Sequence, residues 1–247
     1  MEKSSHQVNV KVKDANEIYD PEFRKLIKSK KLTVIIPVGS IEQHGAHLPI
    51  TTDSDIVTEI ASRLAKKCGF IVFPTISYGI SEEHDPLFHI SLKENTLLRI
   101  LKSIHESLFH QGRDTKMIIL NGHHGNVGAL NNIRQAVPHV FVEARQLRSY
   151  SYWHFMEHEF DHAGFVETSI MLAISDKVKM QKAEKGLITK GLSDEEIQRI
   201  NKLSTQPGGF PQVAKNGVWG DPTGATKKDG EKFLAEIVRN LAKECQS

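Results

Sequence analysis

The run Leu32-Thr33-Val34-Ile35-Ile36-Pro37-Val38 leads directly into Gly39-Ser40-Ile41-Glu42-Gln43-His44-Gly45-Ala46-His47-Leu48-Pro49, and Asp53 follows shortly after. The first segment is apolar throughout and predicts a buried strand. The second segment is a glycine-containing turn that carries an acid and an imidazole, and Asp53 adds a second acid. Carboxylates and imidazoles held on a rigid support are ligands for metal ions. This stretch therefore predicts a metal-dependent active site at the end of a strand.

Short β-rich runs alternate with helical periods along the rest of the chain. The first helix should begin with the capping box Thr52-x-x-Asp55 and stop at Gly69, whereas residues 206–230 are rich in Gly and Pro and should form an ordered loop. This alternation predicts an α/β fold, a three-layer sandwich in which helices flank a mostly parallel central sheet. The further strands are predicted at residues 70–74, 117–121 and 140–144.

The composition limits the classes of function. With 39% hydrophobic and 25% charged residues in a length of 247, the chain can form one domain over residues 1–247, with a core from about residue 30 to residue 245. Basic and acidic residues nearly balance, 32 against 30, so neither nucleic acid nor a membrane is predicted as a partner. Cys68 and Cys245 lack metal-site spacing, and no secretory signal is recognisable, which favours the cytoplasm.

Two chemically dense loops follow predicted strands. One runs from Gly39 to Asp53, and the other is Asn121-Gly122-His123-His124-Gly125-Asn126. Ligands bind beyond the carboxyl ends of the strands in an open parallel sheet, so both loops should reach the same site. Either loop taken alone is also compatible with an ordinary polar turn. Their convergence is what favours a functional site.

The side chains of the first loop divide by direction. In an extended segment, Glu42 and His44 point to one side and Gln43 points away. Asp53, at the start of the following helix, is placed to bridge two metal ions with its two carboxylate oxygens. This arrangement predicts a pair of ions held by the first loop.

The second loop offers His123 directly after a buried strand. Asn121 and Asn126 are suited to brace the turn by hydrogen bonds from side chain to backbone. Two adjacent histidines do not easily reach one ion, so His124 is expected to support the site or face the substrate.

A third group of polar residues lies in Asp161-His162-Ala163-Gly164-Phe165-Val166-Glu167-Thr168-Ser169. If a helix begins near Gly164, Glu167 falls in its first turn, where a carboxylate is favoured by the helix dipole. His162 precedes this helix and is free to act as an acid or a base. Taken on its own, however, Glu167 is better explained as a helix cap.

Together these residues resemble the creatininase family of metal-dependent amidohydrolases. The motifs that carry the resemblance occur in family order and cover most of the chain from about Leu32 onward. They are Gly39-Ser40-Ile41-Glu42-Gln43-His44-Gly45-x-His47-Leu48-Pro49 with Thr52-Asp53, Tyr78-Gly79-Ile80-Ser81-Glu82-Glu83-His84, Asn121-Gly122-His123-x-Gly125-Asn126, His162-Ala163-Gly164 with Glu167-Thr168-Ser169, and Gly217-Val218-Trp219-Gly220-Asp221-Pro222-Thr223.

The resemblance implies a creatininase-like α/β fold, a homo-oligomer that is commonly a hexamer, and a centre of two divalent metal ions. These ions are usually zinc, with manganese or iron in some members. Carried over to this chain, the metal ligands are Glu42, His44, Asp53 as the bridge, and His123. Creatininase has an acid where this chain has Gly125, and Glu167 resembles the replacement ligand.

The resemblance also assigns the remaining roles. His162 and Glu167 are the expected catalytic residues, with His162 as the general acid or base. His84, His124 and Trp219 are the expected contacts with a small-molecule amide substrate. The family often has Phe-Pro-Gly-Thr after the Glu-His pair, whereas this chain reads Asp85-Pro86-Leu87-Phe88 and is one residue shorter, so creatinine itself is not assigned as the substrate.

The expected reaction is hydrolysis of the C–N bond of a small cyclic amide or a formamide, rather than of a peptide. Bound metal lowers the pKa of water from about 15.7 towards roughly 7, which supplies a metal-bound hydroxide. Two alternatives stay within the family. One is deformylation of a formylaminopyrimidine nucleotide in riboflavin or deazaflavin biosynthesis, with Arg145, Arg148 and Lys215 as candidates for the phosphate. The other is trimming of a peptide during maturation of a redox cofactor.

Two readings lie outside this chemistry. His154-Phe155-Met156-Glu157-His158 matches the H-x-x-E-H pattern of inverted zinc metallopeptidases, which requires both histidines on one helix face. A purely structural zinc site is closed and often rich in cysteine. Because the candidate ligands here are carboxylates and imidazoles on separate loops, the sequence favours catalysis.

Overall fold

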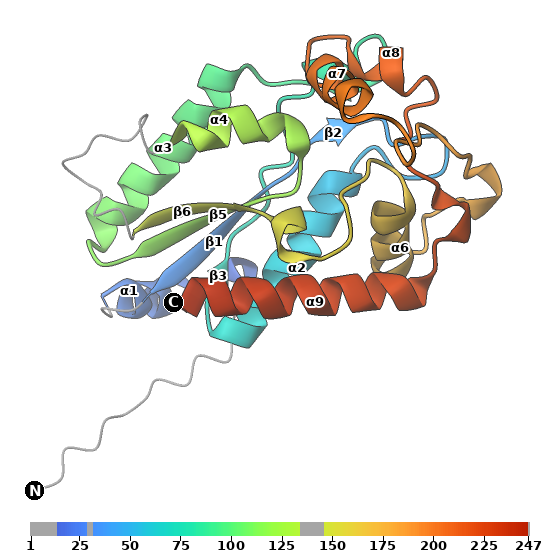
Figure 1. Cartoon of the computed structure of the whole chain (residues 1–247). Helices are drawn as coiled ribbons and strands as arrows, with labels where there is room; N and C mark the ends of the chain where they lie inside the picture. Colours follow the sequence, from blue (N-terminus) through green and yellow to red (C-terminus); the bar gives the residue numbers. More distant parts are fainter. Residues whose placement is uncertain (1–13, 29–31, 134–145, 247) are drawn as a thin grey trace, which may run out of the picture.

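The computed structural model describes residues 14–28, 32–133 and 146–246. Within them the central sheet has four parallel strands in the order β3-β1-β5-β6 (Figure 1). These strands are β1 (Thr33–Val38), β3 (Ile71–Val72), β5 (Lys116–Asn121) and β6 (Leu147–Ser151). The predicted parallel sheet is therefore confirmed, and β1 and β5, whose ends carry the two dense loops, are direct neighbours.

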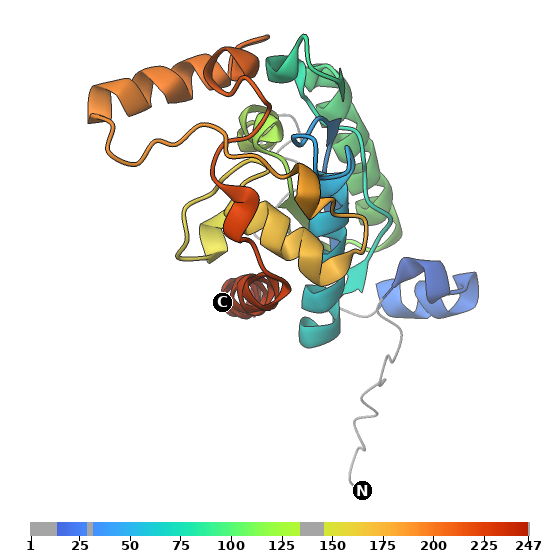
Figure 2. The ribbon, with the colours of Figure 1, turned by 90° about the vertical axis from the view of Figure 1, so that its right-hand side faces the viewer.

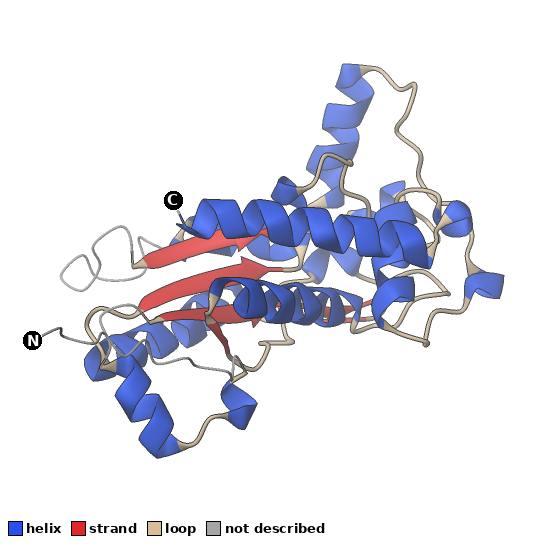
Figure 3. Ribbon diagram, turned by 90° about the horizontal axis from the view of Figure 1, so that it is seen from below, coloured by secondary structure: helices blue, strands red, loops and turns tan. Residues whose placement is uncertain are grey.

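Alternation along β1 divides its side chains between two hydrophobic cores, one on each face of the sheet. Ile35 packs with the first core, whereas Val34 and Ile36 pack with the second. The strands lie between these two layers of helices (Figure 3), which confirms the three-layer α/β fold. The first core includes residues of α2 (Thr52–Cys68), α6 (Phe165–Ile174) and α9 (Lys227–Gln246), and the second includes residues of α1 (Asp20–Ile27), α3 (Glu94–Gln111) and α4 (Val127–Asn131).

Helix α2 begins against the ends of β1 and β5 because two glycines let it approach. A Cβ on Gly39 would collide with Ser54, and a Cβ on Gly122 would collide with Val57 and the Asp53 carbonyl. The first turn of α2 therefore lies between the two strand ends. The helix stops at Gly69, which adopts a left-handed φ of 77°, as predicted.

The predicted capping box of α2 is wrong. The N-cap is Thr51, which makes no side-chain cap hydrogen bond and instead donates from its hydroxyl to Asp55. The first turn of α2 is fixed by a different contact, because the Ser54 hydroxyl donates to the carbonyl of Ser40 at 3.0 Å. The loop that follows β1 therefore anchors the first turn of α2 through the Ser54 side chain.

Other differences concern short elements. Strand β3 is shorter than predicted, β6 was not predicted, and the strand predicted at 140–144 lies outside the described residues. The segment 206–230 is not a single loop, because it contains α8 (Phe210–Val213) and the beginning of α9. A second, antiparallel pair joins β2 (Ile41–Glu42) to β4 (His89–Ile90), and α7 (Asp194–Ser204) precedes α8.

Short 3-10 helices connect these elements. Among the described helices, none combines the length and the apolar character that crossing a membrane requires. The 3-10 helices are η1 (Ala15–Glu17), η2 (Glu82–His84), η3 (His124–Asn126), η5 (Tyr152–Phe155), η6 (Met180–Lys182) and η7 (Pro222–Gly224).

Candidate metal centre and active site

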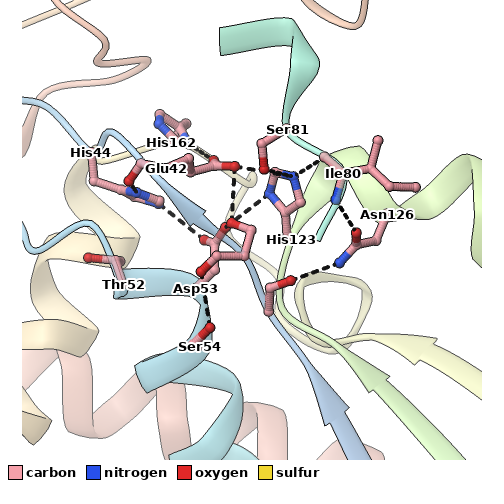
Figure 4. Close-up of polar contacts among 12 residues, drawn as sticks. Glu42, His44, Thr52, Asp53, Ser54, Ile80, Ser81, His123, Asn126 and His162 are labelled. Atoms are coloured by element: carbon pink, nitrogen blue, oxygen red, sulfur yellow. Dashed lines mark hydrogen bonds and ion pairs between the residues drawn. The ribbon is translucent and has the colours of Figure 1, made fainter. Parts of the chain in front are cut away.

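Five polar side chains from different elements meet beyond the carboxyl ends of β1 and β5. Figure 4 shows four of them, Glu42, His44, Asp53 and His123. Each of the five is between 0% and 3% exposed. Glu42 comes from β2, Asp53 from the first turn of α2, and Glu167 from the first turn of α6. His44 and His123 come from the loops after β2 and β5. The structure thus brings together all of the sequence-predicted ligand candidates.

The five side chains form two groups that share Asp53. His44, Asp53 and Glu167 each offer one ligand atom within 4.8 Å of the others, and so do Glu42, Asp53 and His123. The two oxygens of Asp53 face opposite ways: Oδ1 lies 3.1 Å from His44 Nε2 and Oδ2 lies 2.9 Å from His123 Nδ1. This is the arrangement expected of a bridging carboxylate.

Backbone hydrogen bonds set the orientation of both imidazoles. His44 Nδ1 donates to the carbonyl of Glu42 at 3.2 Å, and His123 Nε2 donates to the carbonyl of Ile80 at 2.7 Å. In each neutral ring the other nitrogen then presents a lone pair to the Asp53 carboxylate. A lone pair facing a carboxylate at about 3 Å is repulsive unless a proton or a metal ion lies between them.

The carboxylates around His44 also favour a positive charge at this position. Burial alone would lower the pKa of its imidazole, but the charges of Asp53, Glu167 and Glu42 outweigh burial and raise the pKa to about 10. Without a metal ion, a proton on His44 has to balance these carboxylates. A bound cation could take over this role.

Glu167 is held by the turn that precedes α6. Its Oε2 accepts from the backbone N–H of Ala163 at 2.7 Å, and its Oε1 lies 3.4 Å from the Tyr152 hydroxyl. Burial raises the pKa of Glu167, because the carboxylate has lost its hydration. The sequence alternative that Glu167 caps its own helix is wrong, since the residue that accepts from the first N–H groups of α6 is Asp161.

Asp161 shapes the first turn of α6. Its two carboxylate oxygens accept from the backbone N–H groups of Val166 at 2.8 Å and Glu167 at 3.3 Å. Gly164 leaves room for this contact, because a Cβ there would collide with the Asp161 carboxylate. Asp161 therefore places Glu167 within reach of His44, a role that the sequence analysis missed.

A second set of rings lies beside Glu42. His84 Nε2 lies 3.0 Å from Glu42 Oε1, and His162 Nδ1 lies 3.8 Å from the same oxygen. Burial lowers the pKa of His162 well below its usual range, which keeps the ring neutral. The prediction that Gln43 points away is wrong: its Nε2 donates to His84 Nδ1 at 3.0 Å and lies 3.2 Å from His162 Nε2.

A cavity of about 650 Å³ opens onto the cluster. It is lined by the sequence-predicted substrate contacts His84, His124 and Trp219 and by His162, the predicted acid or base, so the structure brings these residues to one site. Trp219 is joined to His162 by two backbone hydrogen bonds, at 3.1 and 2.8 Å.

The cavity wall carries no lysine or arginine among the residues that the structure describes. Of the three candidates for a phosphate contact, Arg148 donates to Tyr150 and Lys215 is exposed, and neither lines the cavity. Arg145 lies outside the described residues. The charged and ionisable side chains of the described wall are therefore carboxylates and imidazoles.

Glu83 is a nearby carboxylate that the sequence analysis did not single out. Its Oε1 lies 3.5 Å from His123 Nε2. Gly125 makes room for it, because a Cβ at that position would collide with the Glu83 carboxylate and the Ile80 carbonyl. The position that holds an acid in creatininase thus has no space for a side chain here.

The H-x-x-E-H pattern does not form a metal site in the structure. His154 belongs to η5, which ends at Phe155, so His154 and His158 do not share a helix face. Both histidines are exposed, and neither belongs to a candidate metal group within the described ranges. The inverted-peptidase reading is therefore excluded.

The fold and the site define a three-layer α/β protein with a buried cluster of carboxylates and imidazoles suited to metal ions. The chain belongs to the creatininase family: the family model described as creatinine amidohydrolase matches residues 16–245. It is thus a member of a family of metal-dependent amidohydrolases, which confirms the resemblance seen in the sequence.

Individual relatives differ in activity. The chain is 33% identical over 224 residues to the mycofactocin precursor peptide peptidase of Mycobacterium ulcerans, a match that covers 83% of this chain and 81% of that protein. It is 34% identical over 105 residues to the 2-amino-5-formylamino-6-ribosylaminopyrimidin-4(3H)-one 5'-monophosphate deformylase of Methanobrevibacter ruminantium, covering 38% and 40%. A solved manganese creatininase matches with a TM-score of 0.77 and 22% identity, covering 96% and 98% of the two chains.

Proposed function

We propose that this protein hydrolyses an amide bond within a peptide, using two divalent metal ions held by Glu42, His44, Asp53, His123 and Glu167. The observation that carries the proposal is the pair of ligand groups that share Asp53. Each group supplies one imidazole whose free nitrogen faces the shared carboxylate. Such a donor set fits two cations and leaves coordination positions open for a reaction.

The chemistry of the donors indicates which ions fit. Both groups mix imidazole nitrogen with carboxylate oxygen, which suits zinc, manganese or iron. Calcium and magnesium prefer oxygen ligands alone. When bound, two such ions lower the pKa of water and polarise the carbonyl under attack.

His162 is the residue that we propose for proton transfer. Its Nε2 donates to the carbonyl of Gln43 at 3.1 Å, so that Nδ1 carries the lone pair and faces Glu42. Because burial keeps the ring neutral, Nδ1 can accept a proton and later deliver it to the leaving nitrogen. The ring of Phe210, whose centroid is 4.8 Å from that of His162, packs against the imidazole in this orientation.

Two observations support a peptide over the smaller substrates that the sequence favoured. The similarity to a precursor peptide peptidase extends over most of both chains. The cavity, at about 650 Å³, lies within the usual range for ligand pockets, and residues of α7 form part of its lining. The described wall has no lysine or arginine, so it offers a nucleotide phosphate none of the side chains that usually bind one.

A substrate panel tests the proposal. The protein, reconstituted with Zn²⁺ or Mn²⁺, is incubated with creatinine, a formamidopyrimidine nucleotide, and synthetic peptides of four to twelve residues, and products are identified by mass spectrometry. The expected result is cleavage of peptides at one type of bond, lost in His162→Ala. Turnover of creatinine or of the formamide with no peptide cleavage would reject the peptide assignment. Turnover of none of them would reject the proposed activity.

A further inference from the structure

Helix α7 projects from the body of the protein (Figure 2), and residues at its C-terminal end line the cavity. Its C-terminal end adjoins α8, and its N-terminal end, at Asp194, is the outer end (Figure 2). Among the described residues, neither hydrophobic core contains a residue of α7. The apolar side chains of this helix therefore have no role in the main core.

One face of α7 joins the cavity wall to two isoleucines. Asn201, Ser204 and Thr205 line the cavity. Ile197 lies four residues before Asn201, and Ile200 lies four residues before Ser204, so that both share this helix face with the wall residues. Ile197 and Ile200 are partly exposed. The polar wall of the cavity thus continues outward as an apolar track along α7.

We infer that this track, defined as Ile197 and Ile200, binds apolar side chains of the peptide substrate on one side of the cleaved bond. The inference rests on the proposed peptide hydrolysis and adds a determinant of specificity to it. Ser204 and Ile197 are separated by about 10 Å along the helix, which corresponds to about three residues of an extended peptide. A peptide that leaves the cavity along α7 would place its next few residues on the two isoleucines.

The position of the track argues for the substrate as its occupant. Ile197 and Ile200 lie one helical turn before Asn201 and Ser204, which line the cavity, so a peptide that extends from the cavity along this face of α7 reaches both isoleucines. Isolated helices as short as α7 are marginal in water. A bound peptide that covers Ile197 and Ile200 would therefore stabilise the helix as well as gain apolar contact.

Truncated peptides test the inference. A twelve-residue peptide cleaved by the unsubstituted enzyme is compared with its shortest truncation that is still cleaved. In the double variant Ile197→Ser with Ile200→Ser, KM for the long peptide should rise at least about fivefold, with kcat unchanged. Both parameters for the short peptide should stay the same. The control, Glu195→Ser with Arg199→Ser, alters the opposite face without changing net charge and should leave all values unchanged.

Several results would overturn the inference. An unchanged KM for the long peptide would show that the track binds nothing, and an equal rise for both peptides would place the effect inside the cavity. A change in sedimentation of the double variant would show that the face contacts a second copy of the chain. If the unsubstituted enzyme cleaves no peptide, the proposed function itself fails. Should circular dichroism show that the double variant is unfolded, Ile197→Ser alone provides the same comparison.

Discussion

The substitution Glu167→Gln separates the two proposed ion sites. Glutamine keeps the shape of the side chain, and its amide oxygen can still accept from the N–H of Ala163. Glutamine cannot ionise, so the carboxylate that faces His44 across 3.6 Å is no longer available to a cation. Because burial raises the pKa of Glu167, the unfolded chain releases a proton near pH 7 that the ion-free folded protein keeps, so the variant without ions should be at least as stable as the unsubstituted protein. Only the group of His44, Asp53 and Glu167 should lose its ion.

The size of the effect follows from linkage between binding and folding. One ion present at a hundred times its Kd stabilises the folded state by about 2.7 kcal/mol. For a chain of this length, that gain corresponds to a rise in Tm of about 5 to 10 °C. Two sites should give about twice this rise in the unsubstituted protein, and Glu167→Gln should give about half of the total.

Differential scanning fluorimetry with and without Zn²⁺ or Mn²⁺ measures the rise, and elemental analysis of gel-filtered protein counts the ions. Glu83→Gln is the matched control, because it removes a neighbouring carboxylate that belongs to neither group sharing Asp53, and it should retain both ions. A variant Glu167→Gln that keeps two ions and the full rise in Tm would refute the assignment of Glu167. Loss of an ion in Glu83→Gln would instead identify Glu83 as a metal ligand.

Three further predictions concern the surroundings of the site. Gly125→Ala should push the Ile80 carbonyl away from His123, because the new Cβ would collide with that carbonyl. We expect Zn²⁺ binding, measured by calorimetry, to weaken at least about tenfold and the unfolding free energy to fall by about 1 to 3 kcal/mol. Unchanged Zn²⁺ binding would contradict this prediction. Asp161→Ala should lower that free energy by about 1 to 2 kcal/mol in urea, because two N–H groups of α6 lose their acceptor, and an unaltered midpoint would count against the capping role. Burial lowers the pKa of His105 in the folded protein. Below about pH 6.5 the unfolded chain therefore binds a proton at His105 that the folded protein does not bind, and the free energy of unfolding falls as the pH falls. His105→Gln should reduce the loss of stability between about pH 7.5 and pH 5.5, and equal losses in both proteins would disprove the effect.

Strands and helices with strong periodicity could be predicted from the sequence, whereas short elements could not. The apolar run of β1 and the glycine that ends α2 are local signals and gave correct predictions. Strand β6 reads Leu-Arg-Ser-Tyr-Ser, which lacks an apolar pattern, and it is a strand because it pairs with β5. The start of α2 likewise depends on Gly39 and on the carbonyl of Ser40, which no local rule connects.

The convergence of Glu42, His44, Asp53 and His123 was predictable because their loops follow neighbouring strand ends, whereas Glu167 became a candidate ligand only through the family resemblance. The direction of Gln43 was not predictable, since the loop after β2 does not keep the alternation of an extended strand, and the side chain turns to His84 and His162. Asp161 was also missed, because its role as a cap spans five and six residues rather than the usual two or three. The contacts of Gln43 and Asp161 depend on the three-dimensional course of their loops, which sequence patterns do not specify.

Anomalous diffraction at the metal edge, combined with elemental analysis of the same metal-replete crystals, tests most directly whether two ions share Asp53. The proposed centre predicts two ions per chain about 3.5 to 4 Å apart, with one oxygen of Asp53 on each. His44 and Glu167 should bind the first ion, and Glu42 and His123 the second. A single ion, an ion bound elsewhere, or a cluster that stays free of metal at saturating Zn²⁺ and Mn²⁺ would contradict it.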